Sequence, residues 1–142
     1  MVSLASIGYN TNILSKAVYI RGGVSMSKTI SYRLKHVGIN CENAEEANQL
    51  VKVLCALFNM EKGADNDLRV FVGNAFEVMK YPKWGTKGHI GLSTDDVEAA
   101  MADLSAKGIE FYEEGMRRDE NGKINFVYLK QDFAGFAIHI CN

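Results

Sequence analysis

Four side chains of this sequence have the chemistry of a divalent-metal site: His36, Glu77, His89 and His139. They include all three histidines of the chain. Three imidazoles and one carboxylate suit Zn, Fe(II), Mn, Ni or Co, with a position left for water or substrate. No short ligand pattern such as HxxxH brings them together. The prediction of one shared site therefore depends on the elements that carry these residues.

The sequence repeats itself around two of these histidines. His36-Val-Gly-Ile-Asn-Cys-Glu-Asn-Ala-Glu-Glu-Ala47 aligns with His89-Ile-Gly-Leu-Ser-Thr-Asp-Asp-Val-Glu-Ala-Ala100. The two segments share the His, the Gly, one Glu and the final Ala. A repeat of this length that occurs twice indicates a duplicated supersecondary unit, since a solenoid needs three or more copies.

Each copy is predicted to be a strand, a helix and then further strands. In the first copy, Asn43 and Glu46 have the spacing of a capping box, and apolar residues then recur at intervals of three and four. Gly73-Asn74 is typical of a tight hairpin. The predicted elements are a strand over 31–40, the helix from 44 onward, a loop over 62–67, and strands over 68–72 and 75–81.

The second copy follows a linker over 82–87 that holds the only proline of the chain. Its helix is predicted to begin after Asp95 or Asp96 and to stop at Gly108. The other predicted elements are strands over 88–93 and 109–113, a charged turn over 117–122, and strands over 123–130 and 135–141.

Side-chain alternation places the four candidate ligands on one face of these strands. In each first strand the His and the Gly share a face, and the apolar neighbours point to the opposite face, toward the helices. Each last strand adds one ligand to the polar face, Glu77 in the first copy and His139 in the second. We therefore predict a concave polar pocket, with glycines that leave room for a close approach.

The His-x-Gly strand, the capped helix and the paired modules resemble the vicinal oxygen chelate superfamily, which includes glyoxalase I, methylmalonyl-CoA epimerase, extradiol dioxygenases and the bleomycin and fosfomycin resistance proteins. The resemblance covers about 32–142. It implies an α+β fold in which two tandem βαβββ modules form a curved, cupped mixed sheet with the helices outside. In metal-binding members the ligands lie on the first and last strands of each module, which correspond here to His36, Glu77, His89 and His139. His139 departs from the family, where this ligand is usually Glu.

The expected domain boundaries follow from the repeat. Residues 1–30 are predicted to be an N-terminal extension, either an arm, an added strand or the result of an upstream start. The domain covers 31–142, with module one at about 31–81 and module two at about 88–142. The segments 124–130 and 135–139 are also similar to a domain that accompanies bacterial 2-dehydro-3-deoxyphosphogluconate aldolases, which implies sugar-acid or 2-oxo-acid metabolism.

Taken with this resemblance, the site predicts a metal-dependent glyoxalase-like isomerase, epimerase or lyase. It would act on a small 2-oxo or hydroxy acid or sugar acid through a metal-stabilised enolate. Glu77, the one carboxylate of the set, is the candidate base, and Tyr128 or Lys130 are alternatives. The second hypothesis is a non-catalytic ligand-binding module or an aldolase-associated regulatory module. Dioxygenase chemistry is disfavoured because its ligands are two histidines and one glutamate.

Composition limits the partners. With 142 residues, 47% apolar and 23% charged, the chain has the balance of one globular domain. A net charge of −1 gives no general attraction for nucleic acid or an anionic membrane. Polar residues interrupt the apolar first 20 positions, which fit neither a signal peptide nor a membrane span. A small oxygenated carboxylate is the expected partner.

The cysteines, the basic residues and the aromatic residues of the linker are expected to have mainly structural roles. Three cysteines without a CxxC spacing indicate a reducing compartment, so we expect a cytoplasmic protein, in which Cys141 is a buried thiol. Contact with an anionic substrate or, as the favoured alternative, a solvated surface position is expected for Arg33, Arg69, Lys80 and Lys130. Arg117 and Arg118 are expected in a solvated turn. The linker aromatics Tyr81 and Trp84 either edge the pocket or cover the core. A homodimer is expected from the resemblance.

Overall fold

The computed structural model describes residues 29–142, so the predicted extension lies, up to residue 28, outside the described residues. Within this range the order of strand, helix and three strands occurs twice, as predicted. Module one consists of β1 (Arg33–Asn40), α2 (Ala44–Phe58), β2 (Lys62–Asp65), β3 (Arg69–Val72) and β4 (Phe76–Met79). Module two consists of β5 (Gly88–Ser93), α3 (Val97–Ala106), β6 (Arg117–Arg118), β7 (Ile124–Tyr128) and β8 (Phe136–Cys141).

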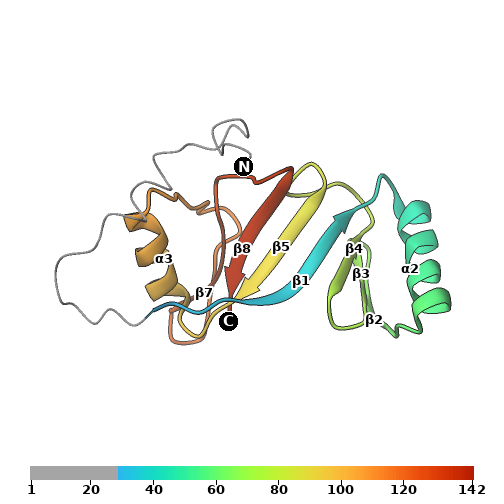
Figure 1. Ribbon diagram of the computed structural model, residues 1–142, viewed down its shortest axis with the longest axis horizontal. Helices are drawn as coiled ribbons and strands as arrows, with labels where there is room; N and C mark the ends of the chain where they lie inside the picture. The colour runs from blue at the N-terminus through green and yellow to red at the C-terminus, as the bar shows by residue number, and fades with distance from the viewer. Residues whose placement is uncertain (1–28) are drawn as a thin grey trace, which may run out of the picture.

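The strands of residues 29–142 form one mixed sheet of eight strands in the order β2-β3-β4-β1-β5-β8-β7-β6. The first strands, β1 and β5, pair antiparallel at its centre. Each is parallel to the last strand of its own module, β4 or β8. The order is therefore the same when each half is followed outward from the centre. Figure 1 shows this arrangement, with α2 and α3 at opposite ends.

Both helices begin at the repeat-equivalent position. The Asn43 side chain accepts a hydrogen bond from the Glu46 N–H, and the Asp96 side chain accepts one from the Ala99 N–H. The Glu46 carboxylate also accepts the N–H of Glu42, which satisfies a second free donor at this helix start. The predicted caps are thus confirmed, with Asp96 chosen over Asp95.

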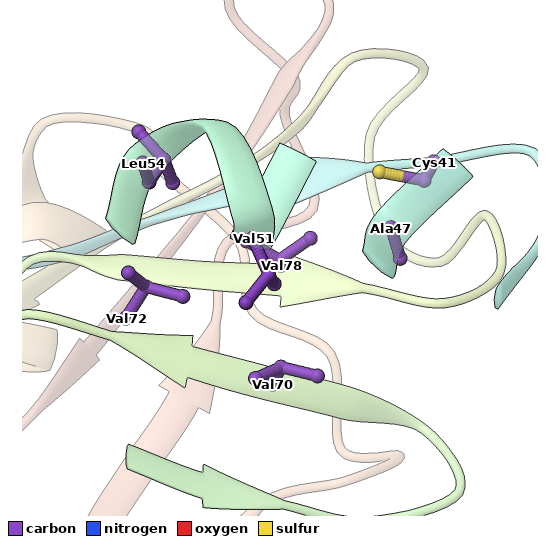
Figure 2. Packing of buried hydrophobic residues seen from close by; sticks show 7 residues of the cluster. All are labelled: Cys41, Ala47, Val51, Leu54, Val70, Val72 and Val78. Atoms are coloured by element: carbon purple, nitrogen blue, oxygen red, sulfur yellow. The ribbon is translucent and has the colours of Figure 1, made fainter. Parts of the chain in front are cut away.

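Each helix packs on the sheet through apolar residues of its own module. Figure 2 shows the first cluster, in which Val51 on α2 faces Val78 on β4. Its members are Cys41, Ala47, Val51, Leu54, Val70, Val72 and Val78. The second cluster contains Val97, Ala100, Ile109, Val127, Leu129 and Ile140. Because side chains alternate along strands, residues between these positions point to the opposite face of the sheet, which the helices leave uncovered.

Three predicted segments were wrong in type. The segment 62–67, predicted to be a loop, contains the edge strand β2, which pairs with β3 through Lys62 and Val72. All of its side chains are exposed, so it lacks the apolar alternation of a strand that covers a core. The charged turn predicted over 117–122 begins with β6, and the strand predicted over 109–113 has only one bridge, from Phe111 to Leu129.

Among the described residues, no helix is long and apolar enough to cross a membrane.

Candidate metal centre

The register of the central strands brings the four predicted ligands together. Gly38 in module one pairs with His89 of module two on one side and with Glu77 of its own module on the other. Gly91 in module two pairs in the same way with His36 of module one and with His139 of its own module. Glu77 and His139 therefore occupy equivalent positions, as the repeat predicts.

The two glycines provide the space that the imidazoles fill. A Cβ atom at Gly38 would lie 2.0 Å from Cε1 of His89. A Cβ atom at Gly91 would lie 2.7 Å from Nε2 of His139 and 2.9 Å from Nε2 of His36. The close approach predicted from sequence is thus made by the histidine rings themselves.

The ligand atoms converge around His36. Its Nε2 lies 3.1 Å from Nε2 of His89, 3.0 Å from Nε2 of His139 and 3.0 Å from Oε2 of Glu77. The same Glu77 oxygen lies 3.0 Å from Nε2 of His89. The three imidazoles offer ligand atoms within 4.8 Å of one another. Glu77, His89 and His139 are buried, whereas the side chain of His36 is 16% exposed.

Hydrogen bonding cannot account for all these short distances. A ring nitrogen has either one hydrogen or one lone pair, so it takes part in one conventional hydrogen bond. Nε2 of His36 has three polar neighbours, and Nε2 of His89 has two. Two ligand atoms that each lie about 2.1 Å from one ion, with an angle of about 90° between them at the ion, lie roughly 3.0 Å from each other. The donor set and its spacing therefore fit a divalent metal ion.

The second ring nitrogens of His89 and His139 are not the atoms that orient these rings. Nδ1 of His89 and Nδ1 of His139 are buried and have no hydrogen-bond partner among residues 29–142. In many metal sites this nitrogen donates to a carboxylate or carbonyl that orients the ring. Here ring packing replaces that bond: His139 lies 4.5 Å from Phe126 and 5.1 Å from Tyr128 between ring centroids.

Glu77 is held in its ionised form. Burial raises its pKa, but hydrogen bonds from His36 and His89 and the charge of Arg69 outweigh burial, so the pKa lies well below its ordinary value. Nη1 of Arg69 lies 2.9 Å from the second carboxylate oxygen. This environment suits a metal ligand better than a general base.

Burial favours the neutral forms of three other groups at the site, namely His139, Tyr128 and Cys141. Burial, with the charges of His36 and His89, lowers the pKa of His139 to about 3, which keeps the imidazole in its ligand form. Burial and the charge of Glu77 raise the pKa of Tyr128 well above its usual range. Burial also raises the pKa of the Cys141 thiol, as expected for a buried cysteine that is not a nucleophile.

A cavity of about 460 Å³ opens over these residues. Among its lining side chains Glu77 is the one carboxylate, against four basic groups. The lining residues are Lys35, His36, Arg69, Phe71, Glu77, His89, Arg117, Arg118, Asn125, Phe126, Tyr128, His139, Cys141 and Asn142. Arg69, Arg117 and Arg118, which were expected mainly at a solvated surface or turn, thus line the cavity.

The comparison with known proteins identifies the fold. No family model and no curated protein sequence matches this chain. A hypothetical protein from Bacillus halodurans matches in structure with a TM-score of 0.57 and 15% identity, over 78% of this chain and 94% of the other. Methylmalonyl-CoA epimerase in complex with methylmalonyl-CoA and NH4+ matches with a TM-score of 0.54 and 18% identity, over 79% and 94%.

The methylmalonyl-CoA epimerase from Mycobacterium tuberculosis matches with a TM-score of 0.52 and 16% identity, over 76% of this chain and 85% of the other. The chain has the fold of the methylmalonyl-CoA epimerases. The resemblance to the vicinal oxygen chelate superfamily is thus confirmed at the level of the fold. These identities assign neither a substrate nor a reaction.

Within this epimerase fold, the register also relates residues that the sequence repeat did not reveal. Phe71 pairs with Glu77 as Tyr128 pairs with His139, so Phe71 and Tyr128 occupy equivalent positions beside the ligands. Both line the cavity. Alternation along the strand could have predicted them, because Phe71 lies two residues after Arg69 and Tyr128 lies two residues after Phe126, and Arg69 and Phe126 also line the cavity. The third strands of the two modules, β3 and β7, were too dissimilar in sequence to align.

The remaining candidate residues lie around the cavity or outside it. Trp84 stacks on Tyr128 with ring centroids 5.2 Å apart and also contacts Tyr112, so it packs behind the cavity wall. Tyr81 is half exposed and does not line the cavity. The three other basic candidates form ion pairs outside the cavity, namely Arg33 with Asp95, Lys80 with Asp65 and Lys130 with Glu110.

Proposed function

We propose that this chain is a divalent-metal-dependent, glyoxalase-like enzyme. It would catalyse an isomerisation, epimerisation or lyase reaction on a small 2-oxo acid, hydroxy acid or sugar acid. The observation that carries this proposal is the convergence of donor atoms from both modules inside a basic cavity. His36, Glu77, His89 and His139 would hold the ion. A bound divalent ion acts as a Lewis acid that polarises the oxygens of a chelating substrate.

The side chains around the ligands have separate proposed roles. The basic residues attract an acid and orient it in the cavity. Glu77 is the one carboxylate side chain among the lining residues, so it is the candidate proton acceptor, although its lowered pKa makes it a weak base and suits it better to hold the metal. Tyr128 keeps its proton at neutral pH, so its hydroxyl is available as a hydrogen-bond donor to a substrate oxygen.

Metal analysis tests the first half of the proposal. Purified protein, reloaded with each candidate ion and desalted, should hold one equivalent of metal by mass spectrometry. His89→Ala should lose it, because His89 is buried and contacts both His36 and Glu77. Arg33→Gln is the matched control, since Arg33 pairs with Asp95 outside the cavity and should leave the metal content unchanged.

Proton exchange tests the second half. Proton abstraction next to a carbonyl exchanges that hydrogen with D₂O, which NMR detects without knowledge of the final product. The panel should include 2-oxo acids, hydroxy acids, sugar acids and acyl-CoA thioesters, because a structural neighbour was solved with methylmalonyl-CoA. Exchange should require metal and disappear in His36→Ala and His89→Ala. Exchange that survives both substitutions and a chelator would exclude this site as its source.

The second candidate function is a non-catalytic binding module, or a regulatory module associated with an aldolase. The lowered pKa values of Glu77 and His139 favour it, because neither group is then a strong base. A bound metabolite detected by native mass spectrometry in protein without metal or proton-exchange activity would support this function over the enzyme.

A further inference from the structure

We infer that the ligand of this cavity carries a second anionic group, a phosphate or a carboxylate, that binds to Lys35 and Arg117 beside the metal centre. This inference rests on the proposed function and narrows its substrate class. The substrate would be a 2-oxo or hydroxy acid with two negatively charged ends, one at the metal ligands and one at this pair of cations.

Lys35 reaches the cavity because of a β-bulge. The register between β1 and β5 runs from Leu34 opposite Leu92 to His36 opposite Gly91, so Lys35 is an extra residue in β1. Regular alternation would turn Lys35 away from the face of His36, yet both residues line the cavity. Bulges re-aim side chains in this way next to functional sites. The second module has no lysine at the equivalent place, since Gly88 precedes His89.

Arg117 is held by aromatic stacking. Its Cζ atom lies 3.8 Å from the ring centroid of Phe126, and that ring lies 4.5 Å from the ring of His139. Such cation–π contact fixes the position of a guanidinium while leaving its N–H groups free to bind an anion. Through Phe126, the cation is therefore held at a set distance from a proposed metal ligand.

Neither cation forms an ion pair with an acidic residue among residues 29–142, in contrast to Arg69. Arg69 pairs with Glu77, whereas no ion pair forms with Lys35 or Arg117. Arg118, on the same strand, donates to the carbonyl of Gly122 and adds a third positive charge to this wall. Glu77 balances Arg69, so the charge of the Lys35 and Arg117 pair is left for a ligand.

The chemistry of the pair defines the group that it recognises. A guanidinium binds a carboxylate or phosphate through two parallel hydrogen bonds, and an ammonium adds a compact charge. An acid with a single carboxylate would use that group at the metal and leave the cations solvated. A second anionic group would satisfy both ends of the cavity.

Three 2-hydroxy acids test the inference because they differ only in the group at the third carbon. Lactate has a hydrogen there, malate a carboxylate and 3-phosphoglycerate a phosphate. Binding to the metal-loaded protein should be measured by calorimetry at fixed ionic strength. We expect malate or 3-phosphoglycerate to bind at least about tenfold more tightly than lactate, and the better of the two identifies the anionic group.

The double variant Lys35→Gln with Arg117→Gln should remove this preference, with a much larger loss of affinity for malate or 3-phosphoglycerate than for lactate, while its metal content stays unchanged. Arg33→Gln, which removes a positive charge outside the cavity, should keep the preference. Equal binding of the three acids by the unmodified protein would overturn the inference. A similar loss of affinity for all three acids in the double variant would do so too.

The metal content of the same samples separates the two proposals. If the protein holds metal but shows no preference among the acids, the second-anion inference fails and the metal site stands. If the protein holds no metal, the proposed function fails, and the three acids are compared on the metal-free protein. A preference that depends on Lys35 and Arg117 there supports the anion site by itself, and equal binding overturns it.

Discussion

At the scale of single residues, the site depends as much on two missing side chains as on the four ligands. Gly38 lies where the ring of His89 from the opposite module passes over the backbone, and Gly91 lies beside the rings of His36 from the opposite module and His139 from its own. Any side chain at these positions would occupy the volume of an imidazole. The His-x-Gly pattern therefore encodes both a ligand and the space for its counterpart from the other module.

Gly91→Ala tests this role directly. Its new Cβ would lie 2.9 Å or less from atoms of both His139 and His36, so at least one ring has to move. We expect metal affinity to fall at least about tenfold and stability to fall by about 1–3 kcal/mol, as for other overpacked positions. Metal titration and urea denaturation measure the two effects.

Gly63→Ala is the matched control for this substitution. Gly63 lies on the edge strand β2, where a Cβ would lie 3.3 Å from the carbonyl oxygen of Phe71, so a small shift accommodates it. Its metal affinity should equal that of the unmodified protein. If Gly91→Ala also retained full affinity, the rings would not be confined as described.

The burial of His139 also predicts how the metal-free protein responds to acid. The pKa of His139 is about 3 in the folded chain against an ordinary value of 6.5, so the unfolded chain binds the proton more readily. Stability should be complete above pH 6.5 and should fall as the pH decreases below it, by at most about 1.4 kcal/mol per pH unit. Glu77 adds its own loss only below its ordinary value of 4.5.

The window between pH 6.5 and pH 4.5 therefore separates the expected contribution of His139 from that of Glu77. Urea denaturation of the chelator-treated protein across this range should show a slope that His139→Gln reduces. An unchanged slope in this variant would assign the acid sensitivity to other groups.

At the scale of elements, each helix is positioned by a local signal at its start. Asn43→Ala removes the side-chain acceptor that binds the Glu46 N–H and should cost about 1 kcal/mol of stability. Asn43→Ser keeps a cap and should cost much less. Thermal or urea unfolding measures the difference. Because α2 packs on the face of the sheet opposite the site, metal affinity should be the same in both variants.

Local signals also explain which elements could be predicted from sequence. The caps at Asn43 and Asp96 are readable because the capping bond spans only three residues. The edge strand β2 is not, because its exposed side chains carry no apolar alternation. The bulge at Lys35 is not, because it depends on pairing with β5, which is distant in sequence. Missing that bulge is why the sequence placed no cation from β1 in the cavity.

At the scale of the whole molecule, duplication explains the ligands, and divergence between the modules explains the charges. Glu77 and His139 could be predicted because two copies of one module must share a register. The next strand differs between the copies. Arg69 pairs with Met79 on β4, and Phe126 pairs with Cys141 on β8, so an arginine in one module corresponds to a phenylalanine in the other.

This asymmetry gives the two sides of the cavity different chemistry. In module one Arg69 neutralises Glu77, whereas in module two Phe126 supports Arg117 beside the neutral His139. The repeat could not reveal this, because equivalent positions carry different residue types in the two modules. The expected homodimer is a separate prediction, which analytical ultracentrifugation checks.

The proposed ion would connect the two modules across the central pair of strands. His36 and Glu77 come from module one, and His89 and His139 come from module two, so unfolding of either module would release it. An ion that binds only the folded chain stabilises it by about 2.7 kcal/mol when its free concentration is 100 times its dissociation constant. Zn²⁺ or Ni²⁺ buffered at that ratio should therefore shift the whole unfolding transition, and a chelator should reverse the shift.

Removal of one ligand from either module distinguishes a shared ion from an ion held by one half. His36→Ala and His139→Ala should each abolish most of the stabilisation by metal, although they lie on strands of different modules. If one variant kept the full shift, the ion would belong to the other module alone. Loss of the shift in both, with a single unfolding transition in each metal-free variant, would show that the ion couples the two halves of the sheet.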